Sequence, residues 1–151
     1  MADRGRSGQR KDQASPNVDG IGTDLLLSED FDHGRVTALR HAVASAAAGC
    51  GLAGDRLDDF VVAVNELLTN AVRHGGGSGN VALWRAGDSV VCEVTDHGSG
   101  LPGGRSAHPA RPTGDEPGGW GLWLAGRLTD SFDMTTGSIG TAVRISTRIS
   151  E

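Results

Sequence analysis

The chain has 151 residues and a formal net charge of −5, from 19 acidic and 14 basic residues. This length favours a single domain with one core, and the acidic balance argues against direct binding of nucleic acid, which needs a basic face. No apolar run is long enough to span a bilayer, and no apolar segment of a secretory signal follows the first basic residues. We therefore expect a soluble, cytoplasmic protein that acts away from membranes.

The N-terminal part of the chain, residues 1–22, is polar, charged and rich in glycine, without any period. Such a composition cannot bury enough apolar surface to fold, so we predict a disordered tail followed by one domain over residues 23–151. The two cysteines, Cys50 and Cys92, match neither a disulfide framework nor a metal-binding spacing. We interpret both as small buried or half-buried hydrophobic residues.

The first predicted elements are a strand and a helix. Thr23 to Glu29 has an apolar centre with polar flanks, which favours a strand that could lie at the edge of a sheet. Asp32 can cap a following helix, because apolar residues recur with helical spacing over residues 36–47. The glycines Gly49 and Gly51 predict where this helix ends.

A second helix is predicted to begin with Asp55 as its N-cap and to end at the three glycines of residues 75–77. Two strand-like runs follow, Asn80 to Arg85 and Ser89 to Thr95, joined by a turn that contains Gly87. These runs and their turn predict a β-hairpin. The apolar side of the helix comprises Leu57, Phe60, Val61, Val64, Leu67, Leu68 and Ala71.

The stretch from Asp96 to Pro117 has no period and many glycines and prolines, and a loop of this length inside a compact domain is usually functional or disordered. A third helix then opens at Gly118-Gly119-Trp120-Gly121, and a second hairpin follows, from Ser131 to Thr136 and from Thr141 to Arg148. Hairpin-joined strands, with three helices to cover one face, predict an α+β fold. We expect a two-layer α/β sandwich whose mixed sheet is mostly antiparallel.

Three polar residues, Glu66, Asn70 and His74, lie at four-residue steps in the second helix and would form one stripe on its surface. The carbonyl oxygen of the Asn70 side chain is a suitable ligand for Mg2+, which prefers oxygen donors. Glu66, one turn earlier, could orient or deprotonate a nucleophile. The alternative is an ordinary solvated helix face, and His74 is better explained as a helix-end residue that bonds the last carbonyls.

A second motif, Asp96-His97-Gly98-Ser99-Gly100, comes directly after an apolar strand. A carboxylate at a strand end can accept a hydrogen bond from an amino group such as the exocyclic amine of adenine. The glycines would let a flat ring approach the main chain closely. The same residues are also compatible with an ordinary Asp-Gly turn.

The third motif is the glycine-rich start of the third helix, Gly118 to Gly121. A glycine-rich turn that leads into a helix presents free N–H groups and the positive end of the helix dipole to a phosphate. The motif is not a P-loop, because it lacks the Gly-Lys-Ser/Thr ending, and no β-α-β unit surrounds it as in a dinucleotide-binding fingerprint. The alternative is a flexible hinge before an ordinary helix.

In this order and together, the motifs resemble the GHKL ATPase (Bergerat) fold, which histidine-kinase catalytic domains, gyrase, the Hsp90 chaperone and anti-sigma factor kinases share. The run Glu66-Leu67-Leu68-Thr69-Asn70-Ala71-Val72-Arg73-His74-Gly75 is most similar to the single-domain anti-sigma factor kinase branch. The resemblance extends from about Asp24 to Ile149. It implies a protein that binds ATP and Mg2+.

The resemblance also implies a role for each matching residue. Asn70 would hold Mg2+ against the ATP phosphates, and Glu66 would be the general base for the attacking hydroxyl. Asp96 would bind the adenine amine, with Thr141 beside it acting through its hydroxyl or a bridging water. The segment at about 101–117 would be the ATP lid. The glycines that the resemblance assigns to the site are Gly98 and Gly100 at the adenine, and Gly119 and Gly121 at the phosphates.

The function implied by this branch is that of an anti-sigma factor with serine/threonine protein kinase activity, which regulates transcription by partner switching. Its partners would be a sigma factor and a STAS-domain anti-sigma factor antagonist, and the resemblance is compatible with a homodimer. An ATP-binding regulatory module without phosphotransfer is the alternative, because binding motifs do not prove turnover. A detached histidine-kinase catalytic domain would need a phosphoacceptor histidine, and His41 lacks the acidic neighbour expected after such a residue.

Overall fold

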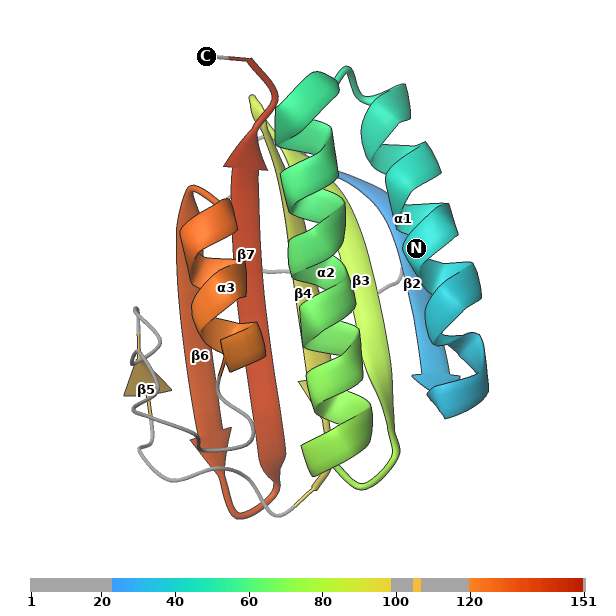
Figure 1. Ribbon diagram of the computed structural model, residues 1–151, viewed down its shortest axis with the longest axis vertical. Coiled ribbons are helices and arrows are strands. Elements are labelled where there is room, and N and C mark those ends of the chain that lie inside the picture. Colours follow the sequence, from blue (N-terminus) through green and yellow to red (C-terminus); the bar gives the residue numbers. More distant parts are fainter. Residues whose placement is uncertain (1–22, 99–104, 107–119, 151) are drawn as a thin grey trace, which may run out of the picture.

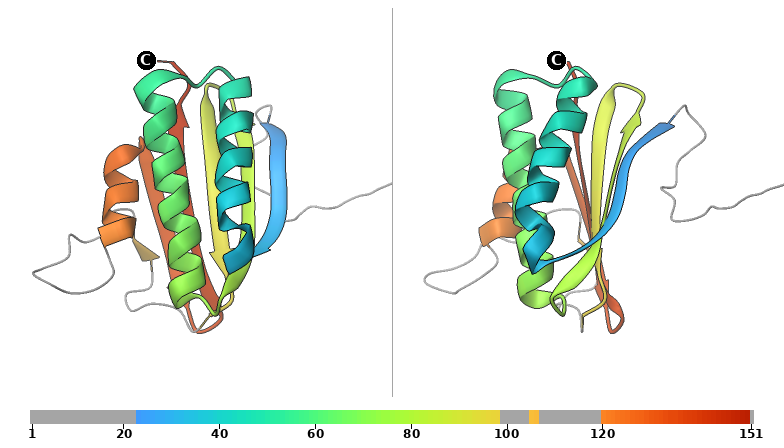
Figure 2. Two further views of the ribbon diagram at one scale, coloured as in Figure 1. Left: turned by 45° about the vertical axis from the view of Figure 1, so that its right-hand side comes forward. Right: turned by 90° about the vertical axis from the view of Figure 1, so that its right-hand side faces the viewer.

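The computed structural model describes residues 23–98, 105–106 and 120–150 of the chain. In this part of the chain, three α-helices cover one face of a six-stranded sheet (Figure 1). The side view in Figure 2 shows these helices together on the same side of the sheet. The predicted two-layer α+β sandwich is confirmed, whereas the predicted tail at 1–22 and the lid at about 101–117, apart from residues 105–106, lie outside the described residues.

The strands of the sheet are β2 (Thr23–Asp32), β3 (Ser78–Ala86), β4 (Ser89–Asp96), β5 (Arg105–Ser106), β6 (Ser131–Gly137) and β7 (Gly140–Arg148). The helices are the 3-10 turn η1 (His33–Arg35), α1 (Val36–Gly49), α2 (Gly54–His74) and α3 (Trp120–Leu128). The strand order is β2-β3-β4-β7-β6-β5, and all pairings between these strands are antiparallel. β2 therefore lies at an edge, and β4 and β7, from different hairpins, are neighbours at the centre.

The strands alternate their side chains between the helix layer and the uncovered face, because successive residues of a strand point to opposite sides. In β4, Val90, Cys92 and Val94 are buried in the core beneath the helices. Asp96 continues this alternation as the last residue of the strand, so its side chain is directed to the helix side. Cys92 is a buried part of the core, as predicted. Burial raises the pKa of its thiol, and the charge of Glu93 adds to the shift.

The long helix α2 supplies most of the helix layer's contact with the core. It begins at Gly54, and Asp55 lies in its first turn, so the prediction of Asp55 as N-cap is wrong: Ala53 is at that position and makes no side-chain capping bond. A carboxylate in the first turn still interacts favourably with the helix dipole. The helix ends as predicted, where the Gly75 N–H donates to the main-chain oxygen of Ala71 at 2.7 Å. Its buried residues are Phe60, Ala63, Val64, Leu67, Leu68 and Ala71.

The N-terminal strand is longer than its sequence pattern indicates. β2 continues past Glu29 to Asp32, whose Oδ1 accepts the Gly34 N–H at 3.0 Å and so caps η1, which leads directly into α1. The predicted capping role of Asp32 is therefore confirmed, with a 3-10 turn between the cap and the α-helix. His41 is exposed on α1, and Cys50, after the helix, is half-buried. No helix in the described residues is both long and apolar enough to cross a membrane.

A short strand interrupts the stretch that we predicted to be structureless. β5 pairs Arg105 with Thr135 and Ser106 with Met134, at the outer side of β6. Two residues carry no readable period, and their conformation depends on a strand that comes later in the chain, so the sequence pattern alone could not predict this pairing.

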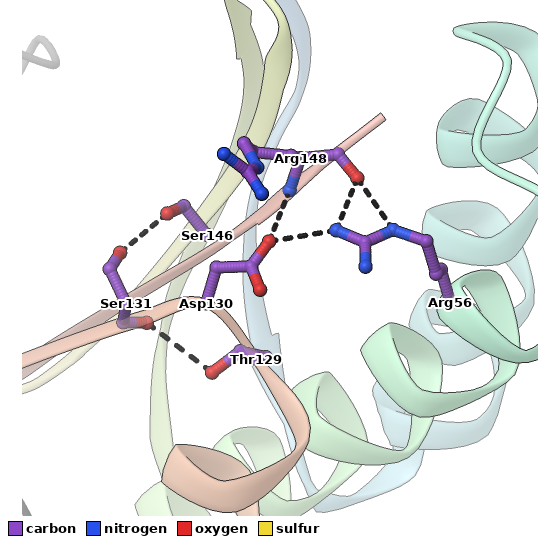
Figure 3. A network of polar contacts seen from close by, with 6 residues as sticks. All are labelled: Arg56, Thr129, Asp130, Ser131, Ser146 and Arg148. Carbon is purple, nitrogen blue, oxygen red and sulfur yellow. Dashed lines mark hydrogen bonds and ion pairs between the residues drawn. The ribbon is translucent and has the colours of Figure 1, made fainter. Parts of the chain in front are cut away.

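A polar network joins the start of α2 to the sheet (Figure 3). The Arg56 guanidinium donates to Asp130 Oδ2 at 2.8 Å and to the main-chain oxygen of Arg148 at 3.0 and 2.8 Å. Asp130 Oδ2 also accepts the Arg148 N–H at 2.7 Å. This N–H, together with the Arg56 bond and charge, holds the pKa of Asp130 below its ordinary range. The network lies at the C-terminal end of β7, whereas Asp96 pairs with Thr141 at the N-terminal end of that strand.

Candidate functional site

The Asp96 carboxylate lies at the end of β4, beneath the helix layer, in a residue that is 5% exposed. Its Oδ1 accepts two main-chain hydrogen bonds, from the Gly98 N–H at 3.0 Å and from the Thr141 N–H at 3.2 Å. Among the described residues, Oδ2 has no such donor. Because a carboxylate in a buried residue is costly unless it is hydrogen-bonded, Oδ2 is a suitable acceptor for the amino group of a ligand.

Glycine main chain encloses Asp96 on several sides. A Cβ on Gly75 would overlap both the Asp96 carboxyl group and the main-chain oxygen of Ala71. A Cβ on Gly98 would lie 2.7 Å from the Gly75 Cα. Gly140 has a φ of 137°, and a side chain there would overlap the main chain of Asp96. The end of α2, the end of β4 and the start of β7 can converge only because these positions have no side chain.

Of these glycines, the sequence predicts only Gly98 at the site. Gly75 is one of the three glycines that predict the end of the second helix, and Gly140 lies between the two strands of the predicted second hairpin. Glycine is common at the end of a helix, so the local pattern explains Gly75 without any further role. It does not indicate a contact with the Asp96 carboxylate, which comes 21 residues later in the chain. Gly100 and Gly119, which are also expected at the site, lie outside the described residues.

Two threonines continue the Asp96 row across the sheet. Asp96 pairs with Thr141 of β7, which pairs in turn with Thr136 of β6. Thr141 is 4% exposed and Thr136 is 8% exposed, and their Oγ1 atoms are 2.7 Å apart. The structure therefore places Thr141 beside Asp96, as expected, and adds Thr136, which no sequence motif indicates.

The polar stripe of α2 contacts the start of α3. The Glu66 carboxylate lies against Gly121, since a Cβ on Gly121 would be 2.5 Å from Glu66 Oε1. Glu66 and Asn70 are both half-buried. Asn70 lies between Glu66, which contacts α3, and Gly75, which contacts Asp96. The helix rises by about 14 Å from Glu66 to Gly75.

The other predicted stripe residue, His74, is exposed in the last turn of α2. Its position agrees with our interpretation of it as a helix-end residue. Trp120, at the first position of α3, is exposed and packs edge-to-face on Trp123, with ring centroids 5.5 Å apart. The Arg127 guanidinium carbon lies 5.6 Å from the centroid of the Trp123 ring. The side chains of Trp120, Trp123 and Arg127 therefore lie next to one another along α3.

A cavity of about 290 Å³ lies where β4 and β6 end and β7 begins, and its lining includes Asp96, Thr136 and Thr141 together with Thr95, Thr135 and Ala142. Thr95, Ala142 and Thr135 form a cross-strand row that alternates with the Asp96 row, so their side chains point away from the helices. No described residue of α2 or α3 lines this cavity. Among the described residues, the cavity is therefore lined by the Asp96 end of the candidate site and not by Glu66 or Asn70.

The described residues contain no group of three or more His, Cys, Asp or Glu side chains that could hold a metal ion by themselves. A magnesium site that includes a nucleotide needs fewer protein ligands, because Mg2+ usually keeps several waters and binds one or two protein groups together with phosphates. The half-buried Asn70 carboxamide, on the same helix face as Glu66, fits that requirement as a single oxygen ligand.

Comparison with protein families shows to which class of protein this chain belongs. Residues 30–147 match the family model described as the histidine kinase-like ATPase domain. This match covers most of the chain, and the chain therefore belongs to the histidine kinase-like ATPase family. Membership implies ATP binding. This agrees with the half-buried Asn70 and with the Asp96 Oδ2, to which no group of the described residues donates a hydrogen bond.

A solved structure with a similar fold is the crystal structure of the RsbU and RsbW domains of Rv1364c from Mycobacterium tuberculosis. Its TM-score is 0.61 with 23% sequence identity, and the match covers 85% of this chain and 32% of that chain. At this identity the likeness shows a shared fold. A search of curated proteins gives no match.

Proposed function

We propose that this protein is an anti-sigma factor with serine/threonine protein kinase activity, which uses ATP to phosphorylate a STAS-domain antagonist. The observation that carries this proposal is the placement of Glu66, Asn70 and Asp96 along one side of the junction between α2 and the sheet. Family membership supports the ATP-dependent part. The run from Glu66 to Gly75 and the structural likeness to a chain with an RsbW domain support the anti-sigma factor kinase branch.

Base recognition in this proposal depends on Asp96 and Thr141. The Asp96 Oδ1 is held by two main-chain N–H groups, which leaves Oδ2 to accept a hydrogen from the exocyclic amine of adenine. The Thr141 hydroxyl, on the neighbouring strand, is within the same row and would contact the base directly or through a water. Gly98 and Gly100 have no side chains, so the ring could approach the main chain there. Gly100 lies outside the described residues.

Phosphate binding and phosphotransfer depend on α2 and the start of α3. The N-terminus of α3 would present N–H groups to the phosphates at Gly119 and Gly121. Asn70 would hold Mg2+, which when bound would supply positive charge against the phosphate oxygens. The Glu66 carboxylate, which lies against Gly121, would take the proton of the antagonist's serine or threonine hydroxyl. The hydroxyl oxygen then forms its bond to the γ-phosphorus as the bond to the ADP oxygen breaks.

The regulatory consequence follows from the charge that is transferred. A phosphoryl group adds about −1.5 to −2 charges to the antagonist's docking surface, which would separate it from this acidic protein. The protein would then be free to bind its sigma factor. In this proposal it acts in the cytoplasm, and it could do so as a homodimer.

The experiment that tests the proposal is incubation of the protein with γ-labelled ATP, Mg2+ and the cognate antagonist. We expect label on the antagonist with the wild type and its loss with Glu66→Gln. Asp58→Asn, which removes an exposed carboxylate from the same helix, is the matched control and should leave labelling intact. Equal labelling by Glu66→Gln would exclude Glu66 as the base. ATP binding without any labelling by the wild type would establish the alternative, a regulatory ATP-binding module.

A further inference from the structure

The Thr136 hydroxyl lies one strand beyond Thr141 and contacts it directly. The two residues are paired in register between β6 and β7, and Thr141 is paired with Asp96 on its other side. The Thr136 and Thr141 Oγ1 atoms are 2.7 Å apart, and both residues are nearly buried. The hydroxyl that neighbours Asp96 is therefore itself hydrogen-bonded to a second hydroxyl, and both residues line the cavity beside Asp96.

A hydroxyl carries one proton and can donate only one hydrogen bond at a time. In a threonine pair, one hydroxyl donates and the other accepts. If Thr136 donates, Thr141 keeps its own proton for a third group, and Thr141 then acts as a donor toward a ligand. If Thr136 is removed, the Thr141 hydroxyl can rotate and can also act as an acceptor toward the ligand.

We propose that Thr136 is a positioning residue that sets the base specificity of the nucleotide site by holding Thr141 as a donor; this inference rests on the proposed ATP-binding function. Adenine presents an amino donor next to the acceptor N1, which matches the Asp96 carboxylate and a Thr141 donor. Guanine presents the acceptor O6 next to the donor N1–H. It would place an acceptor against Asp96 and a donor against the Thr141 proton, so both contacts would be unfavourable.

The role predicts a specific pattern of nucleotide affinities. Removal of the Thr136 hydroxyl by Thr136→Val should weaken ATP binding by about 3- to 10-fold, the effect of one neutral hydrogen bond. GTP binding should weaken less or become stronger, because a rotated Thr141 hydroxyl can accept from guanine N1–H. The ratio of ATP to GTP affinity should therefore fall, and Thr136→Ser, which keeps the hydroxyl, should restore it.

The chain offers a matched control in Thr147, a second buried threonine on the helix-facing side of β7. It is 3% exposed, and its hydroxyl has no hydrogen-bond partner among the described residues. Thr147→Val makes the same chemical change away from Asp96 and should leave both nucleotide affinities unchanged. A merely structural role of a buried threonine would affect both nucleotides equally, so the affinity ratio separates positioning from packing.

The test is isothermal titration of ATP and GTP into the full chain carrying each substitution, with thermal unfolding to check that each variant folds. An ATP to GTP ratio that stays at the wild-type value in a folded Thr136→Val protein would overturn the inference. Failure of the wild type to bind ATP at all would instead reject the proposed function. If Thr136→Val does not fold, 1-deaza-ATP, which lacks N1, tests the step on which the inference depends, a hydrogen bond that Thr141 donates to N1. The wild type should bind it about 3- to 10-fold more weakly than ATP, and equal binding would overturn the inference.

Discussion

The Asp96 carboxyl group packs directly against the Cα of Gly75, so the last turn of α2 and the end of β4 meet without any side chain on the helix. This contact fixes the distance between the helix layer and the sheet at the candidate site. A Cβ at residue 75 would overlap the Asp96 carboxyl group on one side and the Ala71 carbonyl on the other. Neither of these two overlaps can be relieved by rotating the end of a flexible side chain.

Gly75→Ala should therefore move Asp96 or unwind the end of α2. We expect a loss of about 1–3 kcal/mol in the free energy of unfolding, as for overpacking in a core, and weaker ATP binding. Urea unfolding and isothermal titration measure the two effects. The control is Gly49→Ala at the end of α1, where a Cβ meets no atom within 4 Å. If Gly75→Ala were as stable as the wild type and bound ATP equally, the contact would have no influence on the site.

Asp96→Asn should weaken ATP binding, because it replaces a charged acceptor for the adenine amine by a neutral amide. A hydrogen bond to a charged group contributes about 1.5–3 kcal/mol, so the dissociation constant should rise by about 10- to 100-fold. Titration of ATP into the variant measures the change. Asp88→Asn in the exposed β3–β4 turn is the control, with no expected effect. An unaltered affinity in Asp96→Asn would show that another residue binds the amine.

Asn70→Ala should remove the Mg2+-dependent part of ATP affinity and leave the Mg2+-independent part. The reason is that the carboxamide oxygen would contact the ion, whereas the base would be bound by Asp96 on the sheet. The measurement is ATP affinity in the presence of Mg2+ and in the presence of a chelator. Asn65→Ala, also half-buried on α2, is the comparison. Equal losses under both conditions in Asn70→Ala would contradict a metal-binding role.

Asp130→Asn should destabilise the protein at neutral pH by about 1 kcal/mol or less, the usual range for a partly exposed ion pair. The folded-state pKa of Asp130 is lowered, first by the Arg148 N–H and then by Arg56, so its stabilisation is present above the unfolded-state pKa. It is lost as the pH falls below the ordinary value of 3.8 and through the folded-state pKa. In urea unfolding, the free energies of unfolding of the variant and the wild type should therefore differ at pH 7 and become equal in strong acid. A difference that stays constant at all pH values would exclude titration of Asp130 as its source.

Most of the fold could be predicted because each helix and long strand has its own hydrophobic period. The β3–β4 hairpin and the end of α2 at Gly75 follow from local residue types. The exceptions depend on contacts between distant segments. Asp55 resembles an N-cap in sequence but lies inside the first turn, and the β5 pairing of residues 105–106 has no local signal.

The residues of the candidate site also fall into two groups, those that the sequence indicates and those that depend on contacts between distant segments. Glu66, Asn70 and Asp96 could be proposed because spacing on a helix and position after a strand are visible in the sequence, and the family resemblance then assigned their roles. Gly75 and Thr136 could not be proposed, because their importance depends on which strand ends beside the helix and which strand follows β7 in the sheet. The roles of all these residues stay predictions until nucleotide binding is measured.

The row formed by Asp96, Thr141 and Thr136 has a consequence for how the protein could change its ligand. The three side chains share one face only because β4, β7 and β6 are paired in one register. A shift of β6 by a single residue would turn Thr136 to the uncovered face and bring a neighbour of opposite orientation beside Thr141. The two-residue turn at Ser138 and Ile139 sets that register. Insertions or deletions in this exposed hairpin could therefore alter nucleotide preference without any substitution inside the site.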